Sequence, residues 1–135
     1  KTFIEKRPPK TTGREIYNED FLSKALNNTG KVDIFDLLRT LARFTAESIA
    51  KNLRLHVPHV KILVVVGGGA FNKTILNDLK DLSFEVIIPE ETLINFREAV
   101  SIALLGELFL RGMAHSITVT GAKKPAVLGK LALPV

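Results

Sequence analysis

The sequence contains no cysteine, which excludes a disulfide framework, a thiolate metal site and a cysteine nucleophile. Its three histidines are also not spaced like metal ligands, since His56 and His59 flank Pro58 in a predicted connector and His115 stands far away. We therefore expect no metal site made by this chain alone. The lack of cysteine fits a reducing compartment.

Long apolar runs are missing as well. The longest, residues 62–71, is interrupted by three glycines and is far shorter than the roughly 20 residues of a membrane span. A second candidate, residues 99–113, carries Glu107 and Arg111. We expect neither a secretory nor a membrane-spanning segment. Because the sequence begins at Lys1 rather than at methionine, we expect a segment of a longer protein.

The composition is that of a folded domain. Of 135 residues, 46% are hydrophobic and 24% charged, which is enough apolar material for a core and unlike a disordered chain. The net charge of +5 comes from scattered basic residues. The densest cluster, between Lys6 and Arg14, is not interleaved with aromatic residues as in a platform that stacks single-stranded nucleic acid. We interpret the basic residues as a solvated surface, with neither nucleic acid nor a membrane as partner.

The periodicity of apolar residues predicts an α/β fold. Helices are expected over residues 14–26, from the N-cap Asp33 to Arg54, after the N-cap Asn72, and over residues 95–111. Residues 1–13 should be irregular around Pro8-Pro9. Strands are expected over residues 62–66 and 84–88, with further β-prone pieces at 117–119 and 126–128. The strand–helix–strand order predicts parallel strands flanked by helices.

A glycine-rich turn is the strongest local signal. Gly67-Gly68-Gly69-Ala70-Phe71-Asn72 follows an apolar strand and precedes a helix, so a ligand could approach the backbone and the free N–H groups of the helix start. The dinucleotide fingerprint would require glycine at position 72, and no Gly-Lys-Ser/Thr follows as in a Walker A loop. Taken alone, the turn is equally consistent with nucleotide or phosphate binding and with a tight structural turn.

Two further motifs are ambiguous by themselves. The run Pro8-Pro9-Lys10-Thr11-Thr12-Gly13-Arg14-Glu15 is consistent with a connector that leads into a helix. The run Asn95-Phe96-Arg97-Glu98-Ala99 opens the last predicted helix, where an acidic side chain usually complements the helix dipole.

In this order, however, the motifs form a specific set. Together with Val119-Thr120-Gly121-Ala122 and Val127-Leu128-Gly129-Lys130, they resemble the C-terminal part of the anhydro-N-acetylmuramic acid kinase family, over essentially the whole chain. These are bacterial sugar kinases of the actin, hexokinase and Hsp70 superfamily. The resemblance implies a partial ribonuclease H-like (actin-like ATPase) domain. Residues 1–135 would be the nucleotide-binding C-terminal portion of a two-domain kinase that continues upstream of Lys1.

The resemblance also implies an activity. The family uses ATP and Mg²⁺ to phosphorylate the 6-hydroxyl of 1,6-anhydro-N-acetylmuramic acid while water opens the anhydro bridge, which recycles cell-wall sugar in the cytoplasm. Relatives are dimeric, so a homo-oligomer is expected. The implied ATP-binding residues are Gly67, Gly68, Gly69, Ala70 and Asn72, with Lys10 and Arg14 beside the adenine, and Glu98 is implied to face the sugar.

The chain departs from the family in two ways. Phe71 stands where relatives often have histidine, which should change packing only, and Asn95 stands where they often have aspartate. More importantly, every aspartate is predicted on a helix or its cap, so we expect the general base from residues upstream of Lys1 and no activity from this segment alone. The alternative is a stand-alone α/β module that binds a nucleotide or another anionic ligand without catalysis.

Overall fold

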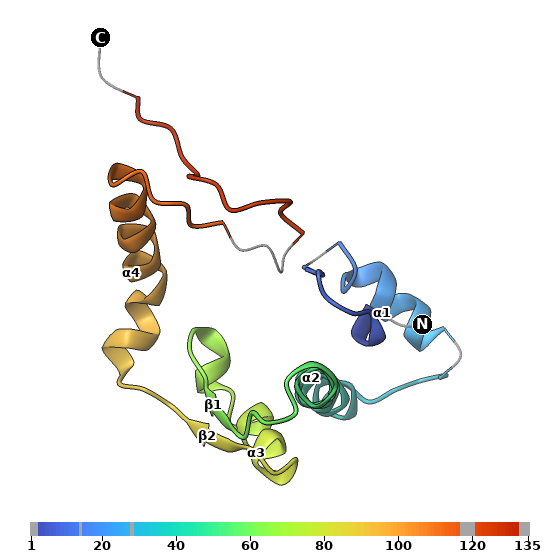
Figure 1. Cartoon of the computed structure of the whole chain (residues 1–135). Coiled ribbons are helices and arrows are strands. Elements are labelled where there is room, and N and C mark those ends of the chain that lie inside the picture. Colours follow the sequence, from blue (N-terminus) through green and yellow to red (C-terminus); the bar gives the residue numbers. More distant parts are fainter. Residues whose placement is uncertain (1–2, 14, 28, 117–120, 133–135) are drawn as a thin grey trace.

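The computed structural model describes residues 3–13, 15–27, 29–116 and 121–132. These residues form four α-helices and a two-stranded parallel sheet, a mixed α/β arrangement that agrees with the predicted α/β class (Figure 1). The elements are two short 3₁₀ helices, η1 (Phe3–Glu5) and η2 (Gly68–Phe71), the helices α1 (Glu19–Leu26), α2 (Ile34–His56), α3 (Lys73–Asp81) and α4 (Glu91–Leu110), and the strands β1 (Ile62–Val64) and β2 (Glu85–Ile87).

Side-chain caps fix where the helices begin. The Asp33 carboxylate accepts hydrogen bonds from the N–H groups of Phe35 and Asp36, and Asn72 accepts one from Ile75, so both predicted N-caps are confirmed. Asn18 caps α1 in the same way, and this helix therefore begins later than the predicted residue 14.

Helix α4 begins earlier than predicted. It starts at Glu91 rather than at residue 95, directly after Pro89 and the N-cap residue Glu90. Residues 91–94 contain no glycine or proline that would delay the helix. The first turn of α4 therefore lies before the Asn95–Ala99 motif, which occupies the second turn.

The two strands pair in parallel, as predicted, with Leu63 opposite Val86 and α3 as the crossover between them. Each strand has three residues rather than the expected five. One face of this small sheet is open, because Ile62, Val64 and Ile87 are 52%, 61% and 42% exposed. The predicted flanking by helices is therefore seen on one face of the sheet only.

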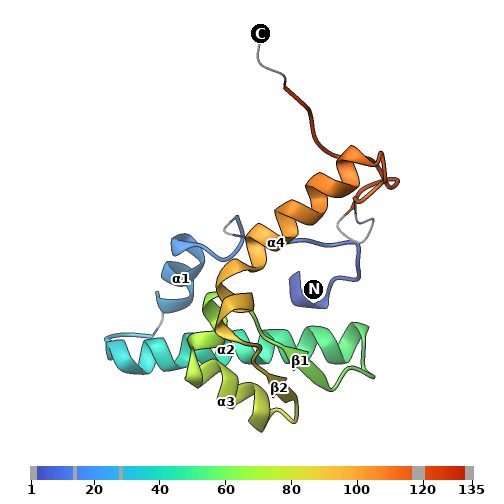
Figure 2. The ribbon, with the colours of Figure 1, turned by 90° about the vertical axis from the view of Figure 1, so that its left-hand side faces the viewer.

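The core lies where α2 and α3 pack together (Figure 2). Ala46 and Ala50, four residues apart on one stripe of α2, are completely buried. Their small side chains let α3 approach closely. Leu79 of α3 is also fully buried, and Leu76 and Phe84 are only slightly more exposed. This layer is the rigid support of the β1–α3 connection.

An ion pair joins the same two helices. Asp78 of α3 is 2% exposed, and its carboxylate accepts two hydrogen bonds from the Arg39 guanidinium at 2.6 and 2.7 Å and a longer one from Arg43. These hydrogen bonds, chiefly those from Arg39, lower the pKa of Asp78, although its burial acts in the opposite direction. The bidentate pair fixes how α3 lies on α2.

We expect Asp78→Asn to lower the melting temperature of the intact protein by several degrees at pH 7, because two arginines lose their buried acceptor. A lowered native pKa stabilises the fold above the unfolded-state pKa of about 3.9, and this contribution is lost as the pH falls through the native value. Thermal unfolding from pH 7 to pH 3 should therefore show the difference in melting temperature between wild type and variant becoming smaller as the pH falls.

The control is Glu47→Gln, which removes an exposed partner of Arg43 and should change the free energy of unfolding by less than about 0.5 kcal/mol. A difference that persists unchanged at pH 3 would contradict the role of Asp78.

Apolar residues occur around the whole circumference of α4, among several charged ones, and most of them are uncovered. Figures 1 and 2 show it rising away from the layer of α2, α3 and the sheet. Within its 20 residues only Ile94 is buried, while Phe96, Val100 and Ile102 are 56–68% exposed. In the described part of the chain, no helix is long and apolar enough to cross a membrane. Apolar residues around the whole of a helix are typical of a buried helix, and the described residues leave most of α4 uncovered.

Neither of the two strands predicted in the C-terminal tail is present in the described residues. Residues 117–119 lie outside the described residues, as do the first two residues of the 119–122 motif. Residues 126–128 form no strand; instead the Ala126 carbonyl accepts hydrogen bonds from the N–H groups of His115 and Ser116. Gly129 then lies against the Phe109 ring, so the tail returns along α4.

Candidate functional site

A hollow of about 310 Å³ lies beyond the carboxyl ends of the two parallel strands. One wall comes from the connection between β1 and α3, and the other comes from the second turn of α4. Ligands of open α/β sheets bind at this edge. We call this site the glycine hollow; its lining consists of Gly67, Gly68, Phe71, Ile94, Asn95, Arg97 and Glu98.

The glycine wall is open to an approaching ligand. Gly67 has φ +72° and ψ −168°, a conformation that only glycine adopts without strain. A Cβ atom built at Gly68 or Gly69 would meet nothing within 4 Å. In the part of the chain that the structure describes, the N–H groups of Gly68 and Gly69 find no acceptor. The turn thus offers free donors and no obstructing side chain.

The rest of the glycine motif does not line the hollow. Ala70 is 5% exposed, so its methyl group belongs to the core, and the Asn72 side chain is used to cap α3. Gly69 is also absent from the lining. Of the five residues implied as ATP-binding, Gly67 and Gly68 are the two that the structure places in this hollow.

The α4 wall carries the charged groups. The Glu98 side chain is 87% exposed, and its Oε1 accepts one hydrogen bond, at 3.4 Å, from the guanidinium of the neighbouring Arg97. The structure thus brings Glu98 into one site with Gly67 and Gly68, although 30 positions separate Gly68 from Glu98. Both departures from the family pattern, Phe71 and Asn95, line the same hollow.

Lys10 lies elsewhere and is occupied. Its ammonium group donates to the carbonyls of Phe3 and Ile4 at 3.4 and 2.8 Å and to the side chain of Asn52 on α2 at 2.5 Å. These bonds engage all three of its donors and tie the N-terminal segment to α2. Arg14, the other residue implied to lie beside the adenine, is outside the described residues.

Carboxylates are scarce around the hollow. The aspartates at 20, 36, 78 and 81 lie in helices and Asp33 is a cap, as predicted, and none of them lines the hollow. In the described ranges, no three histidine or acidic side chains gather to hold a metal ion. Mg²⁺ prefers several oxygen ligands, so Glu98 alone does not form a magnesium site.

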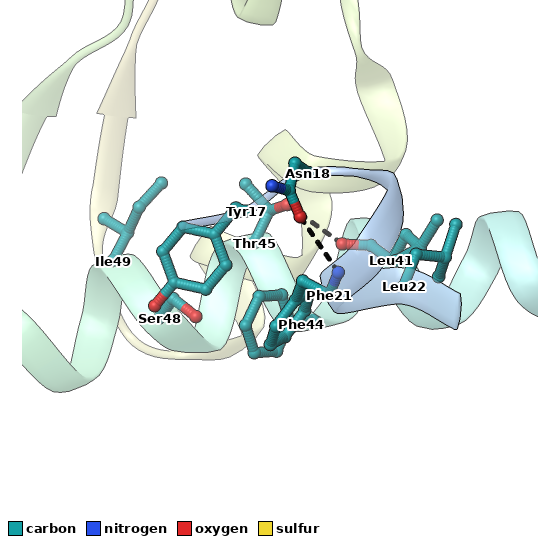
Figure 3. A pocket seen from close by; sticks show the side chains of 9 residues that line it. All are labelled: Tyr17, Asn18, Phe21, Leu22, Leu41, Phe44, Thr45, Ser48 and Ile49. Carbon is teal, nitrogen blue, oxygen red and sulfur yellow. Dashed lines mark hydrogen bonds between the residues drawn. The ribbon is translucent and has the colours of Figure 1, made fainter. Parts of the chain in front are cut away.

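A second concavity, a groove of about 430 Å³ between α1 and α2, is larger but chemically plain (Figure 3). Aromatic rings of Tyr17, Phe21 and Phe44 pack edge-on or tilted along it. Two of its polar side chains form hydrogen bonds with the backbone: Asn18 accepts one from the Phe21 N–H, and Thr45 donates one to the Leu41 carbonyl. The groove has the character of a packing surface, in contrast to the glycine hollow.

The fold and the hollow define the class. The chain is an α/β protein with a glycine turn at the carboxyl edge of a parallel sheet. The turn offers free backbone donors, and a carboxylate lies opposite it. This combination suits a nucleotide and a second ligand that bears a hydroxyl group. The sequence model of anhydro-N-acetylmuramic acid kinase matches residues 1–134. The chain belongs to this family.

Individual relatives agree with the family match. The chain is 34% identical over 137 residues to the anhydro-N-acetylmuramic acid kinase of Clostridioides difficile (strain 630), which covers 96% of this chain and 36% of that protein. It is 33% identical to the kinase of Caldanaerobacter subterraneus subsp. tengcongensis, again over 36% of that protein, and 34% identical to the kinase of Bacillus cereus (strain AH187), over 37%. The chain thus spans little more than a third of the length of these relatives.

Proposed function

We propose that this chain is the C-terminal, nucleotide-binding portion of a two-domain kinase with a partial ribonuclease H-like (actin-like ATPase) fold. The whole protein would use ATP and Mg²⁺ to phosphorylate 1,6-anhydro-N-acetylmuramic acid while water opens the anhydro bridge, giving N-acetylmuramic acid 6-phosphate. This reaction would serve the recycling of cell-wall sugar in the cytoplasm. The observation that carries the proposal is the glycine hollow, which joins Gly67 and Gly68 to Glu98.

The two walls suggest different ligands. The glycine wall has free N–H donors and no Cβ, which suits close contact with the adenosine side of ATP. The α4 wall has an exposed carboxylate, which can accept a hydrogen bond from a sugar hydroxyl and hold it near the nucleotide. In this proposal the nucleotide and the sugar bind to facing walls of the same hollow.

The remaining machinery would come from outside this segment. Phosphoryl transfer needs a base or water-positioning residue and a metal-holding carboxylate, and none of the aspartates lines the hollow. The share of relatives that this chain spans leaves nearly two thirds of a full kinase to supply them. That remainder would also cover α4 and the open face of the sheet, which are apolar and exposed here.

The direct test is an assay of the full-length protein with ATP, Mg²⁺ and the anhydro-sugar in water enriched in ¹⁸O. We expect one phosphoryl group and one water to be added to the sugar, with the label in the sugar product. Phosphorylation of the sugar without uptake of water, or no phosphorylation of it, would contradict the proposal.

We further expect the 135-residue segment by itself to hydrolyse no ATP and to associate, because its sheet has unpaired edges and an open apolar face. Sedimentation at micromolar concentration, beside a coupled ATPase assay, checks both points. A monomer that turned over ATP would instead support a self-contained module.

A further inference from the structure

Arg97 is the cation in the lining of the glycine hollow, and neither the family match nor the motifs give it a role. It lies on α4 next to Glu98, within the second turn. Its side chain is 45% exposed, so the guanidinium is accessible from the hollow without being free of contact with the protein.

The guanidinium has unused donors. It carries five N–H groups, and within the described residues its one hydrogen bond runs from Nη2 to the Glu98 carboxylate at 3.4 Å, near the limit for such a bond. Glu98 is itself 87% exposed, and an exposed pair of this kind contributes little stability. The ion pair with Glu98 therefore does not explain why the lining of the hollow contains an arginine.

The chemistry of the proposed substrate supplies an explanation. An N-acetylmuramic acid derivative bears a carboxylate, and the Glu98 carboxylate that would accept its hydroxyl repels it. With Arg97, the ionic side chains of the lining sum to zero charge; without Arg97, the sugar acid and ATP would both approach a net negative site. Arginine also presents a planar pair of donors that matches a carboxylate.

We propose that Arg97 binds the carboxylate of the sugar and thereby sets the preference of the enzyme for an acidic anhydro-sugar. This inference rests on the proposed function, since it assigns the α4 wall to the sugar and the glycine wall to the nucleotide. The other anionic group that Arg97 could bind is the phosphate chain of ATP. The test distinguishes the two possibilities because it measures the binding of the sugar and of the nucleotide separately.

The test compares the full-length wild type with Arg97→Gln and Arg97→Lys. Calorimetry measures the dissociation constants of 1,6-anhydro-N-acetylmuramic acid, of 1,6-anhydro-N-acetylglucosamine, which lacks the carboxylate, and of a non-hydrolysable ATP analogue. We expect wild type to prefer the acid at least tenfold, Arg97→Gln to lose this preference through weaker binding of the acid alone, and Arg97→Lys to keep part of it. The control Arg111→Gln, at the far end of α4 and outside the hollow, should behave like wild type.

Several results would overturn the assignment. If Arg97→Gln weakened the binding of both sugars equally, Arg97 would have only a structural role. If it weakened the binding of the ATP analogue alone, Arg97 would contact the nucleotide. If the wild type did not prefer the acidic sugar, Arg97 could not set such a preference. The phosphorylation assay separates this inference from the proposed function: an active wild type with an unaffected Arg97→Gln variant refutes only the inference, whereas an inactive wild type refutes both.

Discussion

Gly68→Val in the full-length kinase should raise the KM for ATP at least tenfold, which corresponds to about 1.4 kcal/mol of binding free energy. A Cβ at Gly68 meets no protein atom within 4 Å and Gly68 has no positive φ, so the valine should leave the fold intact. The added atoms would instead occupy the wall of the hollow that the nucleotide is proposed to contact. The effect should therefore appear in nucleotide binding.

Gly69→Val is the matched control. It adds the same side chain one residue along in η2, also with no protein atom within 4 Å, but Gly69 does not line the hollow. We expect its KM for ATP to stay within about twofold of wild type. Equal effects of the two valines would show that the substitution acts through the conformation of the turn, and unchanged ATP saturation in both would remove the nucleotide from this wall.

Glu98→Gln should lower kcat/KM for the anhydro-sugar by roughly ten- to a hundredfold, the range expected when a hydrogen bond to a charged group worth about 1.5–3 kcal/mol is weakened. Glutamine keeps the size of the side chain but loses the charge. Because the carboxylate lies on the α4 wall, the KM for ATP should change little. Steady-state kinetics with each substrate varied in turn measures both.

The control for Glu98 is Glu91→Gln in the first turn of the same helix, outside the hollow. It removes a charge that favours the positive end of the helix dipole and should leave sugar kinetics unaffected. Wild-type sugar kinetics in Glu98→Gln would show that the Glu98 carboxylate does not contact the sugar.

The local features of the fold were predictable from the sequence because they depend on nearby residues. Asp33 and Asn72 are caps in the structure because their side chains bond to N–H groups two or three residues on. The start of α1 was predicted too early, since apolar periodicity does not identify Asn18 as the cap that sets it. The sequence predicted strands flanked by helices but did not show which face of the sheet this segment leaves open, because an apolar strand does not specify which part of a protein covers it.

The site was predictable in part. The motifs indicated Gly67, Gly68 and Glu98, and the structure adds that they share one hollow. Sequence reasoning gave no role to Arg97, although its position beside Glu98 was a usable signal. It expected phenylalanine in place of histidine at position 71 to change packing only, and the structure adds that Phe71 is 58% exposed and lines the hollow. Which side of a turn faces a ligand depends on its three-dimensional path, and apolar periodicity does not show this.

Hydrogen exchange of the full-length kinase, with and without a non-hydrolysable ATP analogue, tests the central claim most directly. The N–H group of Gly68, which lines the hollow, has no acceptor within the described residues and should exchange quickly in the free protein. We predict that saturating nucleotide slows exchange over residues 66–72 and leaves α1 and its groove on α2 unchanged. Protection of the groove, over residues 17–22 and 41–49, with no change over 66–72 would contradict the glycine hollow as the nucleotide site.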